Sequence, residues 1–308
     1  FEMNNLKNTL NLLAVLLFSA STFSKKNQFD KQWAKVDSLE RKGLYRMALD
    51  EVNLIFENAT KVNNHNQVIK SVFFELKYNS YLEEDDYVLG ISRLNTLSDK
   101  APSPSKEILH SLTAEVYWGY YSSNSWKFQN RTNVTEVDLK DIRTWDLRKI
   151  ADQVRTHYLY SLLNSNVSKN KKISDFDEIA SYTKTVETSA MRPTLFDFLA
   201  HRALDFFKST DFGLAGPAET FTLNDERFIG SNSSFINAAK IASSDSLNTD
   251  YYAVRLFYEL TQFHSTKNNR NALFSVEIER IKFIYSNGVI ENKEKLYYSG
   301  LERLAQAY

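Results

Sequence analysis

The residues best suited to chemistry are Asp197, His201 and Asp205, which follow one another at intervals of four in an apolar segment. Side chains four residues apart share one face of a helix, so the two carboxylates would flank the imidazole and could orient it for acid–base catalysis. The same spacing is also typical of a buried histidine held by ion pairs, here beside Arg202. No nucleophile motif accompanies the three residues, so the structural role is favoured and a helical hydrolase is the weakest functional hypothesis.

The remaining histidines are scattered, and none has a second histidine or a cysteine at the ligand spacing of a helix. They lie at positions 65, 110, 157 and 264. The chain contains no cysteine, which excludes thiolate metal sites, cysteine nucleophiles and disulfides within these residues. Structural metal sites need three or four convergent ligands. The sequence therefore predicts no catalytic, cofactor-binding or metal-binding residues, and a protein that is not an enzyme.

Two other polar patterns carry no assigned function. The acidic run Glu83–Asp86 lacks the spaced oxygen ligands and central glycine of a calcium loop, so we expect a solvated helix end. Five asparagines match the glycan acceptor pattern, which arises by chance in a chain rich in asparagine and serine: Asn58, Asn130, Asn133, Asn166 and Asn232.

The composition favours long helices around a bulky core. Hydrophobic residues make up 43% of the 308 residues and aromatic residues 14%, which is enough apolar surface to oppose the chain entropy. Only 8 glycines and 4 prolines occur, which argues against a sandwich or barrel with many tight turns and against glycine-rich phosphate loops. Lys plus Arg and Asp plus Glu number 38 each and are interspersed. We therefore expect no nucleic-acid partner.

The N-terminal residues have the layout of a secretory signal peptide, predicted for residues 3–24. A short polar start with Lys7 leads into the apolar run Leu10–Phe18, and small residues follow. The residues before Met3 are taken as additions to the natural start. Because the apolar run is shorter than the ~20 residues that cross a bilayer, we predict no transmembrane span and an exported protein.

Apolar residues recur at helical spacing along the rest of the chain, which predicts an all-α fold. We expect a helical hairpin domain over 25–210, an irregular connection over 211–233 where Gly213, Gly216, Pro217 and Gly230 gather, and a second helical segment over 234–308. The last helix is still in helical register at Tyr308, so this segment is expected to be truncated at its C-terminal end. The sequence Met191–Thr194 is interpreted as a helix start with proline in the first turn.

The first helical pair resembles a tetratricopeptide hairpin. Two apolar helical segments flank Gly43, with Leu44 and Met47 counted among the inward residues of the second and Ala48 as the small residue where the helices cross. The pattern predicts stacked antiparallel helical hairpins in a tetratricopeptide-like array.

The helix predicted over Ile108–Phe128 is rich in tyrosine and tryptophan. Aromatic residues between Tyr117 and Trp126 recur at helical spacing, so core packing is favoured for them. An aromatic face that binds peptides or glycans is the alternative, because aromatic rings stack on both.

Three segments are more informative about the protein family than the spacing of apolar residues. They are Ile108–Trp118 (ILHSLTAEVYW), Asp141–Leu147 (DIRTWDL) and Arg192–Leu204 (RPTLFDFLAHRAL). Together they resemble the N-terminal region of large bacterial alpha-2-macroglobulin family proteins, of the kind found in Bacteroidetes. The hairpin from Trp33 to Ala48 and the Asn130-Arg131-Thr132 motif fit the same region.

The resemblance implies a non-catalytic helical scaffold at the N-terminus of a long protein exported to the periplasm or outer envelope of a Gram-negative bacterium. The whole protein would be a protease-trapping inhibitor, in which cleavage of a bait segment triggers rearrangement. The implied partners are downstream macroglobulin domains of the same polypeptide and, beyond them, proteases or an envelope protein. Without cysteine this chain has no thioester, and none of the family's functional residues can be carried onto it.

A second hypothesis from another class remains open. The chain could be a free-standing periplasmic helical binding module for peptides or glycans, unrelated to protease control. Its sequence motivation is the aromatic density between Tyr117 and Trp126.

Overall fold

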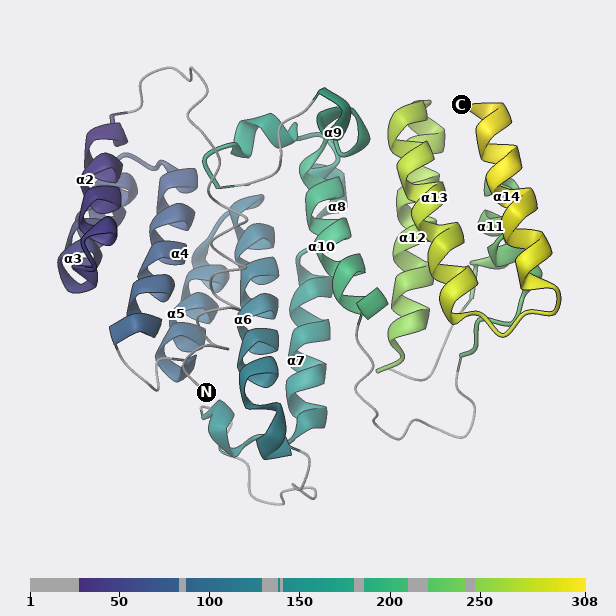
Figure 1. Cartoon of the computed structure of the whole chain (residues 1–308). Helices are drawn as coiled ribbons and strands as arrows, with labels where there is room; N and C mark the ends of the chain where they lie inside the picture. The colour runs from purple at the N-terminus through teal and green to yellow at the C-terminus, as the bar shows by residue number, and fades with distance from the viewer. Residues whose placement is uncertain are drawn as a thin grey trace. The chain divides into compact units, whose positions relative to one another are not determined.

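The computed structural model describes residues 28–82, 87–128, 138, 141–179, 186–209, 221–241 and 247–308. These residues fold as α-helices joined by turns and short 3-10 helices, and no strand occurs among them (Figure 1). A bridge of the antiparallel type joins Lys172 and Thr194. The predicted all-α class is confirmed. The predicted signal peptide, residues 3–24, lies outside the described residues.

The chain divides into two compact units. Unit 1 runs to Val167 and also takes in Ile173–Thr183, whereas unit 2 consists of Ser168–Lys172 and Lys184–Tyr308. The described part of the predicted connection, from residue 221 onward, lies within unit 2 and contains a 3-10 helix. Among the described residues, no helix combines the length and the apolar character that crossing a bilayer requires.

Unit 1 is built from six long helices that pack on one another largely in chain order (Figure 1). Its helices are α2 (Asp30–Arg41), α3 (Tyr45–Lys61), α4 (His65–Leu82), α5 (Tyr87–Lys100), α6 (Ser105–Phe128) and α7 (Leu147–Tyr160), with the short η1 (Ile142–Thr144), α8 (Ser165–Ser168) and η2 (Ile173–Phe176), of which α8 reaches the division between the units.

Contacts between large aromatic rings join helices in the core of unit 1. Trp33 of α2 packs on Phe74 of α4 with ring centroids 4.8 Å apart, and its indole Nε1 donates to Gln67 Oε1 at 2.6 Å. Further along the chain, Tyr117 of α6 stacks on Trp145, which lies between η1 and α7. Such pairs of large rings exclude water from the gaps between helices and fix their spacing.

Positive-φ residues end the helices that turn most tightly. Gly43 (φ +70°) follows α2, and the amide of Leu44 donates to the carbonyl of Leu39 while that of Gly43 donates to Glu40. Asn63 and Asn268 end α3 and α12 in the same left-handed conformation. This hydrogen-bond pattern satisfies carbonyls that would otherwise be unpaired, and glycine or asparagine adopts it at low cost. The predicted turn at Gly43 is therefore confirmed.

Unit 2 is organised around α13, which contacts α9, α12 and α14. Its helices are α9 (Val186–Met191), α10 (Leu195–Ser209), η3 (Glu226–Phe228), α11 (Asn232–Ala238), α12 (Thr249–Lys267), α13 (Arg270–Asn287) and α14 (Lys293–Ala307). Because α13 packs against three helices, two of its polar side chains, Glu277 and Arg280, are buried together with its apolar ones.

Three local expectations are wrong. Helix α10 begins at Leu195 and not around Pro193, because Thr194 caps it: the Asp197 amide donates to Thr194 Oγ1, and the Thr194 amide donates to Asp197 Oδ2 at 2.9 Å. This reciprocal capping box places Pro193 before the helix. Leu44 and Met47, predicted to face inward, are 42% and 54% exposed, whereas Ala48 is fully buried.

Candidate functional site

The face of Asp197, His201 and Asp205, weighed above for acid–base chemistry, lies on α10, but its residues contact different partners. Asp197 is fully buried, and its Oδ1 lies 2.6 Å from Nε2 of His264, which is 1% exposed and comes from α12. Its other oxygen accepts hydrogen bonds from the amide and hydroxyl of Thr194. Asp197 therefore ties the start of α10 to the last turn of α12.

His201 contacts a carboxylate that the sequence did not place beside it. Its Nδ1 lies 3.3 Å from Oε2 of Glu279 on α13, and the imidazole is 1% exposed. Lys208 donates to the other Glu279 oxygen and lies 3.1 Å from Asp205 on its own helix. Asp205 itself is 59% exposed at its side chain. The structure therefore has two pairs, Asp197–His264 and His201–Glu279, and His201 is the buried, ion-paired histidine that the sequence analysis favoured.

The charges around Glu279 decide its protonation. Burial raises the pKa of this carboxyl, but the contact with His201 and the ion pair with Lys208 outweigh burial and bring the pKa down to about 2. The pKa of Lys208 is raised, because the interactions with Glu279 and Asp205 outweigh the opposing effect of burial. Glu279 is therefore ionised at neutral pH and stabilises its two neighbours.

This cluster has little capacity for catalysis. A general base must come within hydrogen-bond distance of a substrate proton, directly or through one water molecule. Both imidazoles are enclosed at 1% exposure. Among the described residues, no group of three or more His, Asp or Glu side chains is arranged to hold a metal ion. The geometry is that of a buried polar support that joins α10 to α12 and α13.

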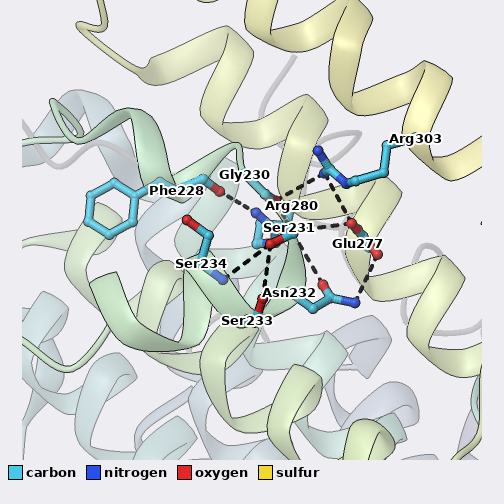
Figure 2. Close-up of polar contacts among 9 residues, drawn as sticks. All are labelled: Phe228, Gly230, Ser231, Asn232, Ser233, Ser234, Glu277, Arg280 and Arg303. Carbon is cyan, nitrogen blue, oxygen red and sulfur yellow. Dashed lines mark hydrogen bonds and ion pairs between the residues drawn. The ribbon is translucent and has the colours of Figure 1, made fainter.

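A second enclosed polar centre fastens the irregular segment before α11 to the last two long helices (Figure 2). Arg280 is fully buried and donates to the carbonyl oxygens of Phe228 and Gly230, the latter at 3.0 Å. Arg303 donates to the same Gly230 oxygen at 3.0 Å and to Glu277 Oε1 at 3.2 Å. Two guanidinium groups therefore satisfy carbonyls that a regular helix would have paired internally.

The remaining contacts complete this centre. Arg280 lies over the ring of Phe235 at 4.3 Å, and the Asn232 side-chain amide donates to Glu277 Oε2 at 2.9 Å. Burial and the nearby charge of Arg303 lower the pKa of Arg280 to about 10, with Glu277 opposing them. The guanidinium stays charged at neutral pH. The side-chain amide of Asn232, at this glycan acceptor match, is half-buried and donates to Glu277.

Unit 1 contains a third buried centre, which the sequence did not predict. His110 of α6 and His157 of α7 are each 7% exposed, and their Nδ1 atoms lie 3.1 Å apart. Burial lowers the pKa of both imidazoles, and that of His157 falls to about 4 because the charge of His110 adds to the effect.

The other predicted features are distributed as follows. Glu83–Asp86, Asn130 and Asn133 lie outside the described residues. Asn58 is on the exposed side of α3, and Asn166 is exposed in α8. In α6, Tyr117 is 1% exposed as core packing requires, whereas Trp126 is 57% exposed with the Lys127 ammonium 5.3 Å from its ring. Core packing is therefore the wrong interpretation for Trp126.

The helical spacing of apolar residues does indicate that His157 and Arg280, which the sequence analysis missed, are buried. His157 falls three and seven residues after Val154 and Ile150, and Arg280 falls four residues after Val276, so both occupy apolar-face positions. A polar residue at such a position is usually buried with a partner. The identity of that partner depends on another helix and has no local signal.

Comparisons of the chain with protein-family models, with curated proteins and with solved structures find no match.

Proposed function

We propose that this chain is the non-catalytic helical scaffold and interaction region of an exported alpha-2-macroglobulin-like protein, which as a whole would trap proteases. The observation that carries the non-catalytic part is the burial of the groups best suited to chemistry. His110, His157, His201 and His264 are all at most 7% exposed and face partners within their own unit. Enclosed groups of this kind stabilise a scaffold.

The three segments that carry the family resemblance are also framework segments. Ile108–Trp118 forms much of α6, Asp141–Leu147 forms η1 and the start of α7, and Arg192–Leu204 leads into α10. Each contributes deeply buried side chains, among them Leu109, Ile142 and Phe196. A resemblance concentrated in core positions favours a shared architecture.

The finer architecture we propose for unit 1 is a tetratricopeptide-like stack of hairpins. In such a stack, the first helices of successive hairpins contact one another, and so do the second helices. The Trp33–Phe74 contact joins α2 to α4, and the guanidinium of Arg93 in α5 lies 4.7 Å from the ring centroid of Phe56 in α3. Both contacts support this alternation.

Export is proposed from the layout of residues 3–24, and the partners from the family resemblance. The chain would sit in the periplasm or outer envelope of a Gram-negative bacterium. It would position downstream macroglobulin domains of the same polypeptide or dock to an envelope protein, with proteases as the targets of the whole molecule.

An antibody raised against this chain tests the proposal in fractionated cells of the source bacterium. We expect the antibody to detect, in the envelope or periplasmic fraction, a polypeptide several times longer than 308 residues. Peptide mapping of that polypeptide should identify β-rich macroglobulin domains after the helical region. Detection of a polypeptide of about this length in the cytoplasm would overturn the proposal.

Trp126 supports a second candidate function, a free-standing periplasmic helical module that binds peptides or glycans. This ring is 57% exposed beside Lys127, and exposed tryptophan faces stack on sugars and peptide side chains. Half-buried Trp118 and Tyr121 lie on the same helix with ring centroids 5.0 Å apart.

Substitution of Trp126 by alanine separates binding from packing. We expect the thermal stability to change little, because an exposed ring contributes little to the core. Binding to an immobilised peptide or glycan array should be lost if the module hypothesis holds. The matched control is Trp145→Ala, which removes a ring that is 4% exposed and should lower stability whatever the ligand. An array signal that survives Trp126→Ala would remove this candidate.

A further inference from the structure

The two imidazoles of unit 1 form a pair with a restricted protonation state. With Nδ1 atoms 3.1 Å apart, one ring must donate an N–H and the other must accept it. One additional proton can be held on the outer nitrogen of the donor ring without breaking this bond. A second proton places two N–H groups opposite each other, so the bond between α6 and α7 is then lost.

Aromatic rings pack against the pair, and each imidazole is 7% exposed. Tyr117 lies with its ring centroid 5.5 Å from that of His157, and the same tyrosine stacks on Trp145 at 5.7 Å. Tyr160 approaches both imidazoles edge-on, at 5.2 Å from His110 and 6.2 Å from His157. An imidazolium in this setting is poorly solvated, so protonation favours any conformation that exposes it.

The charged groups around the pair do not offset the unfavourable free energy of placing a second proton on the two imidazoles. On α6, Lys106 disfavours the charged form of His110 and Glu107 favours it, and Asp99 of α5 favours it as well. On α7, the charge of His110 disfavours the charged form of His157. Among the described residues, α4, which also packs on α6, contributes no charged group that acts on either ring. Both carboxylates therefore act on His110, and none acts on His157.

We propose that His110 and His157 form a pH-sensitive latch between α6 and α7, closed at neutral pH and released by acidification. Release separates the two rings and frees the Tyr117–Trp145 stack, in which the Tyr117 ring lies beside that of His157. The latch belongs to unit 1 alone and does not depend on the proposed scaffold function.

A titration of the full chain by NMR, with the histidine rings labelled with ¹⁵N, tests the latch directly. His65, which is exposed, is the internal reference. We expect the His110 and His157 rings to titrate below the ordinary histidine range, with the His157 pKa at about 4. The indole resonance of Trp145 should shift in the same pH range. Titration of both rings at or above 6.5, or titration that leaves Trp145 unchanged, would overturn the proposal.

A variant series links titration to stability. All four tryptophans lie in unit 1, at positions 33, 118, 126 and 145, so tryptophan fluorescence follows its unfolding. A pKa of about 4 in the folded state against 6.5 in the unfolded state increases the unfolding constant about 30-fold between pH 7.5 and pH 5. His157→Asn should lose most of this increase, and the matched control His65→Asn should retain it. Equal increases in His157→Asn and the wild type would contradict the latch.

Discussion

The two units place their buried histidines beside different partners. In unit 1 the imidazoles of His110 and His157 face each other, and in unit 2 those of His201 and His264 face the carboxylates of Glu279 and Asp197. A carboxylate stabilises a protonated imidazole, whereas a second imidazole accommodates at most one proton in their shared bond. The same residue type therefore has a lowered pKa in unit 1 and lies beside a carboxylate in unit 2.

The difference also bears on function. In both units the histidine side chains that could do chemistry instead join one helix to another. None of these imidazoles is more than 7% exposed. The units differ in the pH range over which these contacts between helices are stable. The predictions below change one partner at a time, beginning with the largest expected effect.

Asp197→Ala should destabilise unit 2 more than any other change considered, by about 4–5 kcal/mol. It removes the charged partner of His264 and both hydrogen bonds to Thr194, which cap α10. Urea unfolding followed by hydrogen exchange of unit 2 peptides measures the loss. Asp205→Ala, on the exposed side of the same helix, is the control and should cost less than about 1 kcal/mol. Similar losses for the two variants would show that Asp197 is not the main support.

Arg280→Met should cost about 3–4 kcal/mol, because a buried guanidinium that satisfies two carbonyls is removed and the carbonyls stay enclosed. The effect should be seen in peptides from residues 226–238, which the Arg280 contacts fasten to α13 (Figure 2). Arg303→Met removes a partly exposed donor to the same Gly230 oxygen and should cost much less. Equal losses would show that Arg280 and Arg303 contribute equally and would contradict Arg280 as the main anchor.

Glu279 determines when unit 2 responds to acid. Its folded pKa of about 2 lies below its ordinary value of 4.5, so its contribution is complete above pH 4.5 and is lost as the pH falls toward 2. We expect Glu279→Gln to lower the stability of unit 2 at pH 7 by about 2–3 kcal/mol and to flatten its pH dependence below 4.5. A pH profile of the unfolding midpoint, compared with that of the wild type, is the measurement. An unchanged slope below pH 4.5 would assign the acid response to other groups.

The overall helical architecture could be predicted because it depends on short-range periodicity. The turn at Gly43 and the buried Ala48 follow from local spacing and from the conformational freedom of glycine. The start of α10 was misplaced because proline in a first turn and proline before a Thr–Asp capping box look alike in sequence. Met47 occupies an inward position only if another element covers that side of α3, and this depends on tertiary packing.

The candidate site was less predictable for a related reason. Asp197, His201 and Asp205 do share a helix, but the partners of Asp197 and His201 come from α12 and α13, and His264 lies 67 residues beyond Asp197. His110 and His157 are 47 residues apart and meet only when α6 packs on α7. The sequence could indicate that such polar residues occupy apolar positions, but not which pairs would form.

The smallest loss of stability is expected from removing an aspartate N-cap of a 3-10 helix, a feature that occurs once in each unit. Asp141 and Asp225 each cap a 3-10 helix by accepting from the amide two residues later, at 2.9 Å in both cases, and each holds the arginine at that position. In both carboxyls the hydrogen bonds from that arginine lower the pKa, against the effect of burial. Asp141→Ala and Asp225→Ala should each cost about 1 kcal/mol, as N-cap removal usually does. Unequal losses in urea unfolding would show that the two caps are not equivalent.

Pulsed hydrogen exchange of the full chain in urea, at pH 7.5 and pH 5, tests the contrast between the units most directly, because peptides report on each unit separately. We predict that the unfolding midpoint of unit 1 is lower at pH 5 than at pH 7.5, because His157, with a folded pKa of about 4, takes up its proton when the unit unfolds, while the Glu279 contribution to unit 2 remains complete. A midpoint for unit 1 that is the same at both pH values, or a larger fall in unit 2, would contradict the account.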